Sequence, residues 1–436
     1  MPVFILRFFS FAFFLLMLNF TNLSSSLIIK LIPSIVFTIV SLILINLTKS
    51  IVDLKLSRNI ALFLFLVMIS VGIFRDNHPE HTGLLVYYRV FNLLLFSWVF
   101  VKTLNYHYKV KSIKIQEVFF YMIYLPLLYL ILINLIFYFL FGSVLNSIET
   151  SEIGSSVMLS TLTGVNYPRV HFLFSNGFNN YGAIVGLLLI FSLIGWKIIR
   201  QSKRVFVIGV LSSIITLLFI DTRTAMVFPI LIFLFIFYSY RFYKKPKFLW
   251  LLPVLTVFGS NLLLLVLGLF NTPFFKSFSR SASDFSTANS RSFIWLFSSL
   301  EFLNFKDIHL IGWGEYGHYE SGVSKNWKFI FETWDNSELM SPHSNFYMIL
   351  FDYGYLGLLL IVLLQILVIS VVKKYWSIDR EICLYIVSFF LYWNLLGMTE
   401  SFFGFYANNI MYIFIGVLMI VFSMKSNYKS ILKKNI

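Results

Sequence analysis

Charged residues and cysteine are scarce in this sequence. Asp, Glu, Lys and Arg together make up 12% of its 436 residues, whereas hydrophobic residues make up 59%. A soluble domain of this length could not hide so much apolar surface. The single cysteine, Cys383, lies in an apolar stretch that we expect to be a helix, so no disulfide can form within the chain.

The sequence also lacks the short motifs of several common active sites. It has no C-x-x-C pair, no H-E-x-x-H zinc signature and no G-x-x-x-x-G-K phosphate loop. We therefore expect neither a metal nor a cofactor.

Apolar stretches long enough to cross about 30 Å of hydrocarbon recur along the whole chain. We expect an all-α integral membrane protein, a single polytopic domain over residues 1–436 with about twelve membrane helices. The expected spans are Val3–Phe20, Leu27–Leu47, Asn59–Phe74, Gly83–Val101, Ile115–Phe141, Asn180–Trp196, Val205–Ile220, Thr224–Tyr240, Phe248–Phe270, Phe346–Val372, Ile382–Leu396 and Phe405–Met424. The first lacks a small-residue cleavage site, so we predict a retained helix and not a signal peptide.

The distribution of basic residues predicts the orientation of the chain. The net charge is +15, and Lys and Arg gather on alternate short connections such as 102–114, 197–204 and 373–380, while acids gather on the connections between them. Under the positive-inside rule, the basic loops and both termini of this inner-membrane protein lie in the cytoplasm. The positive charge is therefore a topology signal, and we expect no nucleic-acid partner.

Two connections on the periplasmic side are long, 142–179 and 271–345. In the second, apolar residues recur at helical spacing after Arg291, which predicts an amphipathic helix on the membrane surface over about 293–305. Every cytoplasmic loop is short and leaves no room for a nucleotide-binding domain. Function is therefore expected on the periplasmic face.

Arg223 lies in the tight hairpin Asp221–Thr224 on that face. The preceding span of about sixteen residues covers roughly 24 Å at 1.5 Å per residue, which puts Arg223 near the outer headgroups. The planar fork of an arginine suits a lipid-linked phosphate. The alternative interpretation is that Arg223 only anchors its helix at the interface, beside Asp221.

Other candidates stand on the same face. Arg291 opens the surface helix, where free backbone N–H groups add to the attraction for an anion, although an ordinary basic first turn is an alternative. His343 precedes a helix at the membrane surface and has the chemistry of a general base, unless it is merely solvated. Asp352, about two turns into that helix, is costly to bury without a functional or pairing role. Arg169 adds a further outward arginine, a weak signal by itself.

Together these motifs resemble the O-antigen polymerase and O-antigen ligase superfamily of bacterial envelope glycosyltransferases. The resemblance runs from about Arg169 to Glu400, whereas residues 325–340 match nothing in the family pattern. The matching positions are Arg169 to Asn180, Thr222-Arg223-Thr224-Ala225, Arg291 and Trp295, Gly312-Trp313-Gly314, His343, Asn345, Asp352, Gly354, Gly357 and Glu400.

The resemblance implies a glycan donor carried on undecaprenyl diphosphate and an inverting, metal-independent transfer. Arg223 and Arg291 would hold the diphosphate, with Arg169 as a third ligand. His343 would accept the proton of the attacking sugar hydroxyl, and Asp352 or Glu400 would orient it. Membrane lipids and a chain-length regulator are the further partners it implies.

Two activities share this signature. A polymerase joins repeat units, and a ligase moves the finished glycan to lipid A-core or another acceptor. Polymerase is favoured because ligases are less varied and this chain diverges strongly outside the signature. A flippase for lipid-linked sugars is the alternative from another class. It would need charges in several spans and internal symmetry, but Arg89 is one of few such charges and no repeat is visible.

Overall fold

The computed structural model describes residues 2–18, 27–48, 60–81, 83–142, 156–165, 167–175, 177–197, 203–242, 246–267, 291–331, 337–404 and 410–434. Helices dominate these ranges. The longer ones are α1 (Pro2–Met17), α2 (Leu27–Leu47), α3 (Ile60–Phe74), α4 (Gly83–Asn105), α6 (Leu125–Phe141), α9 (Phe178–Lys197), α10 (Lys203–Ile220), α11 (Arg223–Phe242), α12 (Leu251–Leu267), α14 (Arg291–Leu303), α17 (Asn345–Tyr375), α18 (Arg380–Gly397) and α19 (Ile410–Lys434). The shorter ones are η2 (Tyr106–Val110), α5 (Ile115–Phe119), η3 (Phe120–Tyr124), α8 (Val157–Thr163), η4 (Lys247–Trp250), α15 (Ile308–Ile311), α16 (Gly317–Glu320), η6 (Val323–Asn326), η7 (Lys328–Phe331) and η8 (Ser337–Leu339).

Each of the twelve expected spans is helical where the structure describes it, with ends that differ by a few residues. Among the described residues, six helical stretches are long and apolar enough to cross a membrane: Ile29–Leu47, Gly83–Tyr108, Ile115–Phe141, Phe178–Lys197, Lys203–Ile220 and Asn345–Tyr375. Buried side chains of helices from α1 to α19 form one apolar core. This architecture fits an integral membrane protein.

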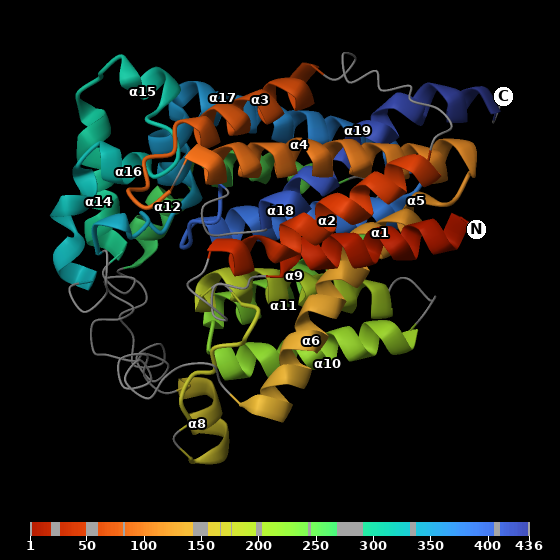
Figure 1. The fold of residues 1–436 in the computed structure, drawn as a ribbon, viewed down its shortest axis with the longest axis horizontal. Coiled ribbons are helices and arrows are strands. Elements are labelled where there is room, and N and C mark those ends of the chain that lie inside the picture. The colour runs from red at the N-terminus through yellow and green to blue at the C-terminus, as the bar shows by residue number, and fades with distance from the viewer. Residues whose placement is uncertain are drawn as a thin grey trace.

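The described residues between α12 and α17, 291–331 and 337–344, gather at one end of the helix bundle (Figure 1), and we call them the outer segment. Figure 1 shows α14, α15 and α16 there, while α1 begins and α19 ends at the opposite side. The predicted amphipathic helix is confirmed as α14, which buries Ile294, Trp295 and Ser298. Parts of both predicted long loops, including 143–155 and 271–290, lie outside the described residues.

The turn after α15 fits into a kink of α17. Gly354 interrupts α17 with φ +65° and ψ −166°. The backbone N–H groups of Trp313 and Gly314 donate to the carbonyls of Phe351 (2.8 Å) and Asp352 (3.0 Å), just before that kink. The glycine-rich turn therefore fixes the outer segment to the start of α17.

Gly354→Ala should destabilise the fold by roughly 3 kcal/mol or more. A Cβ at Gly354 would lie 2.5 Å from the His309 carbonyl oxygen, and it would also hold an L residue at positive φ. Gly322→Ala is the matched control, because Gly322 has φ +76° but no atom within 4 Å of the added Cβ. Thermal unfolding in detergent measures the difference. Equal melting temperatures for the two variants would contradict this account of the turn.

Candidate functional site

Two backbone segments that carry predicted site residues are joined side by side. The Ser344 N–H donates to the Ser401 hydroxyl oxygen at 2.8 Å. The side-chain oxygen of Asn345 accepts from the backbone N–H groups of Phe402 and Phe403, at 2.9 and 3.1 Å. This pairing holds Glu400 beside His343 although 57 residues separate them.

Glu400 lies at the centre of the cluster. Its carboxylate accepts from the Arg291 guanidinium at 2.5 Å and from the Asn179 amide at 3.0 Å, and it lies 3.4 Å from His343 Nδ1. The side chains of Glu400, Arg291 and His343 are 9%, 16% and 19% exposed. An arginine, a histidine and an acid from three distant segments thus meet in a largely buried site.

The charges of this cluster favour an ionised Glu400. Burial opposes ionisation, but Arg291 and His343 outweigh it, so the pKa of the Glu400 carboxyl lies below its ordinary value. A carboxylate beside Nδ1 favours the imidazole tautomer with a proton on Nδ1. In that tautomer Nε2 has a free lone pair and can accept a proton, as in other acid–histidine pairs.

Arg169 lies at the N-terminal end of α9. Its Nε donates to the carbonyl of Ile220 at 2.9 Å, and its guanidinium lies 3.9 Å from the ring centre of Phe178. The first contact ties Arg169 to the hairpin before α11, and the second ties it to the first residue of α9. Arg169 is therefore a neighbour of the Arg223 hairpin.

The Arg223 hairpin packs on the same end of α9. Arg223 is the first residue of α11, and its guanidinium lies 3.8 Å from the Asp221 carboxylate. A Cβ added to Gly182 would lie 2.5 Å from the Thr222 hydroxyl, so the hairpin touches α9 there. Asn179, which binds Glu400, is three residues earlier, on the same helix face and about 4.5 Å away along the axis.

The start of α9 thus links the candidates. Arg169 contacts it at Phe178, the Arg223 hairpin at Gly182, and the Glu400 cluster at Asn179. Asn179 was part of a recognised motif, but no role was predicted for it. Its local signal is its position immediately before the expected span Asn180–Trp196.

Asp352 takes part in a different set of contacts. Its side chain accepts from the Gly317 N–H at 3.1 Å, within the outer segment. Of the two acids predicted to orient His343, the structure brings Glu400 into contact with it and uses Asp352 to hold the turn before α16.

A second polar cluster joins the α3–α4 connection to the outer segment. Arg89 of α4 contacts the Asp76 carboxylate at 2.6 Å and also pairs with Glu315. His81 Nδ1 lies 2.6 Å from Asp76, and the Asn77 amide donates to the Glu315 carbonyl at 3.0 Å. Arg89, one of the few charged residues in the expected spans, is therefore paired with Asp76 and Glu315.

Arg89→Ala should destabilise the protein by about 3–5 kcal/mol at neutral pH, because it leaves two buried carboxylates without their cation. Burial raises the pKa of Asp76, but His81 and Arg89 together bring it below its ordinary value. Its stabilising contribution in the native protein is therefore present above about pH 4 and is lost as the pH falls through the folded-state pKa.

The pH dependence separates the wild type from Arg89→Ala. Acid should lower the melting temperature of the wild type, whereas in the variant protonation neutralises the Asp76 and Glu315 carboxylates that have lost Arg89. The difference between the two melting temperatures should therefore shrink below about pH 4. A difference that does not change with pH would contradict an electrostatic role for Arg89.

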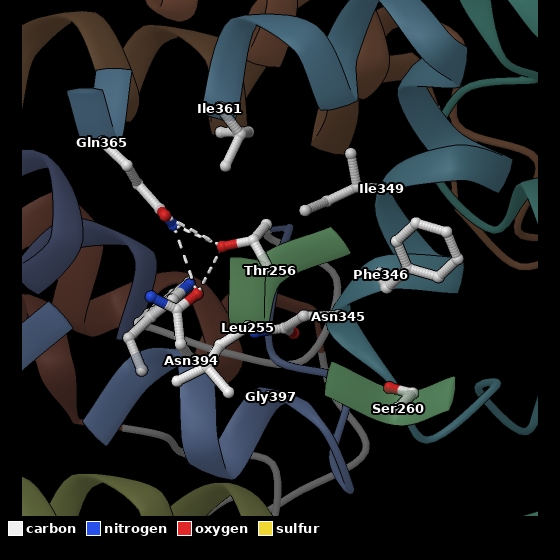
Figure 2. Close-up of a pocket in the computed structure, with 11 residues that line it drawn as sticks. Leu255, Thr256, Ser260, Asn345, Phe346, Ile349, Ile361, Gln365, Asn394 and Gly397 are labelled. Atoms are coloured by element: carbon white, nitrogen blue, oxygen red, sulfur yellow. Dashed lines mark hydrogen bonds between the residues drawn. The ribbon is translucent and has the colours of Figure 1, made fainter. Parts of the chain in front are cut away.

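A pocket with uncharged polar groups lies beside the His343 segment, between α12, α17 and α18 (Figure 2). Thr256 bonds with Asn394 at 2.6 Å and with the Gln365 amide nitrogen at 2.7 Å. Ser260, at the edge of the pocket, bonds to the Ser344 hydroxyl at 2.7 Å. Because no charged residue lines the pocket, the cluster of Glu400, Arg291 and His343 is the better candidate site for an anionic ligand. No group of three or more metal-ligating side chains is found among the described residues.

Residues 208–362 match the family model described as O-antigen ligase. The matched region includes Arg223, Arg291, His343 and Asp352, and it confirms the resemblance to the O-antigen polymerase and ligase superfamily. Arg169 and Glu400 lie outside the matched region. No curated protein and no solved structure matches the chain.

Proposed function

We propose that this member of the O-antigen polymerase and ligase superfamily polymerises lipid-linked repeat units of O-antigen, capsule or a related polysaccharide. It would transfer a glycan from undecaprenyl diphosphate to a sugar hydroxyl of the next unit. The observation that carries the proposal is that Glu400 contacts both Arg291 and His343 beside the N-terminal end of α9. Arg169 contacts the same end of α9 at Phe178. The match over residues 208–362 supports the coarser assignment.

The chemistry needs a base and a cation. His343 Nε2 takes the proton of the acceptor hydroxyl as its oxygen attacks C1 of the donor sugar. The bond from C1 to the diphosphate oxygen breaks with inversion at C1, and both electrons leave with the diphosphate. Arg223 and Arg291, with Arg169 as a third, stabilise the negative charge that grows there. The products are the longer glycan and free undecaprenyl diphosphate, and His343 returns its proton to water.

The lipid carrier would reach the site from the membrane. Phe293, Leu296, Leu300 and Leu303 form an exposed apolar face of α14. Such a face favours insertion into the outer leaflet, with Arg291 at the first turn near the headgroups. Insertion there would put the site on the periplasmic side of the inner membrane, the side that the basic loops predict.

A ligase is the second candidate, and the match to the family model described as O-antigen ligase does not distinguish it from a polymerase. The ligase reaction uses the same donor and leaving group but passes the glycan to lipid A-core. A gene deletion distinguishes the two. Loss of a polymerase leaves single capped repeat units, whereas loss of a ligase leaves long chains on the lipid carrier.

Purified protein tests the shared chemistry. Incubation with a lipid-linked oligosaccharide should release undecaprenyl diphosphate in step with glycan lengthening. A flippase would move the lipid without making a bond. Absence of released undecaprenyl diphosphate from folded protein supplied with both donor and acceptor would overturn the enzyme assignment.

A further inference from the structure

Three ring N–H groups of the outer segment donate to the short stretch of backbone that leads into His343. The bonds are His318 Nε2 to the Leu339 carbonyl (3.1 Å), Trp327 Nε1 to the Met340 carbonyl (3.2 Å) and Trp295 Nε1 to the Pro342 carbonyl (3.1 Å). We refer to His318, Trp295 and Trp327 as the ring clamp. Three of the four residues before His343 are held by it.

The ring clamp is itself rigid. All three side chains are fully buried, and they come from α14, from α16 and from the residue after η6. Trp295 and Trp327 belong to a small apolar core together with Tyr347 and Phe351 of α17. The His318 ring stacks on Trp327 with centroids 6.3 Å apart and an interplanar angle of 19°. Burial lowers the pKa of His318 to about 4, so at neutral pH it is an uncharged donor.

His343 needs such support because its backbone is strained. Its φ is +47°, a left-handed conformation that L residues with a Cβ rarely adopt. Strained conformations persist only where the surrounding structure over-determines them. Before His343 the ring clamp holds the carbonyls, and after it the Ser344 N–H is bonded to Ser401. Contacts on both sides thus fix the direction in which the imidazole leaves the backbone.

We propose that Trp295, His318 and Trp327 are positioning residues that set the His343 imidazole against Glu400 for proton transfer. This inference rests on the proposed function, in which His343 is the base. The ring clamp touches no reacting atom; it acts through the backbone of residues 339–342. Misplacement of a catalytic group slows the chemical step more than it weakens substrate binding.

The test replaces each N–H-bearing ring with a phenyl ring, which has no N–H to donate. Trp295→Phe, Trp327→Phe and His318→Phe should each lower kcat for glycan transfer about tenfold, with KM for the lipid-linked donor changed by less than about twofold. His318→Gln retains an N–H donor and should recover most of the rate. Trp376→Phe is the control, because its buried Nε1 has no hydrogen-bond partner among the described residues.

A second measurement does not depend on activity. Cys383 is buried, so Ser341→Cys, at a half-buried position, gives a single reactive thiol within the clamped stretch. Its labelling by a maleimide should accelerate at least several-fold when Trp295→Phe or His318→Phe is added, and should not change with Trp376→Phe.

The two measurements separate the outcomes. Unchanged labelling, or faster labelling with an unchanged kcat, overturns the positioning role while the proposed function stands. A wild-type protein that releases no undecaprenyl diphosphate removes the proposed function, and the positioning role falls with it, whatever the labelling shows. Slower turnover, unchanged KM, rescue by His318→Gln and faster labelling together support the ring clamp.

Discussion

Replacing His343 with alanine should lower the rate of glycan transfer by a factor of about 10² to 10⁴, the range that a positioned general base contributes. The fall should be in kcat, with KM for the lipid-linked donor nearly unchanged, because the arginines that would bind the diphosphate remain. Release of undecaprenyl diphosphate by the purified protein measures it.

The control for this variant is His78→Ala. His78 is another of the described histidines, stacked on His81 at 4.0 Å and placed in the cluster of Asp76. It should transfer glycan at nearly the wild-type rate. A rate for His343→Ala within about tenfold of the wild type, in protein that melts at the wild-type temperature, would remove His343 from the mechanism.

Hydropathy was sufficient to predict the helices, because a stretch that must cross hydrocarbon leaves a long local signal. The amphipathic helix at Arg291 also followed from local spacing, and α14 begins at that residue. The orientation of the chain in the membrane stays a prediction, since it depends on which loops carry Lys and Arg.

The partners of the site residues left no such local signal. Arg291 and Glu400 are 109 residues apart, and the segment that follows Glu400 is held in place by Ser344 and Asn345. Asp352 was as good a candidate as Glu400 in the sequence. The kink at Gly354 and the turn docked in it give Asp352 the Gly317 N–H as a partner, which no spacing rule predicts.

The Arg89 cluster makes the same point. An arginine within an apolar stretch indicates a functional or paired charge. The sequence alone did not identify its partners, because Glu315 is 226 residues away. The sequence around Glu315 shows only that this residue directly follows Gly312-Trp313-Gly314.

Arg291→Ala should lower the transfer rate by a factor of about 10² to 10³, the loss typical of removing one donor to a developing oxyanion. The same change leaves the Glu400 carboxylate largely buried without its cation, which should cost about 3–5 kcal/mol of stability. Arg291→Lys retains the charge without the planar fork and should fall between the wild type and Arg291→Ala in rate.

Combining Arg291→Ala with Glu400→Gln separates these two losses. The neutral amide no longer needs a cation, so the double variant should melt close to Glu400→Gln alone. Because Glu400→Gln itself alters the partner of His343, the rate of the double variant is compared with that single variant and not with the wild type. We expect it to remain about 10²-fold lower, since the diphosphate has lost a ligand. If the double variant transfers glycan as fast as Glu400→Gln, then Arg291 serves only to neutralise Glu400, and the diphosphate must be bound by Arg223 and Arg169 without it.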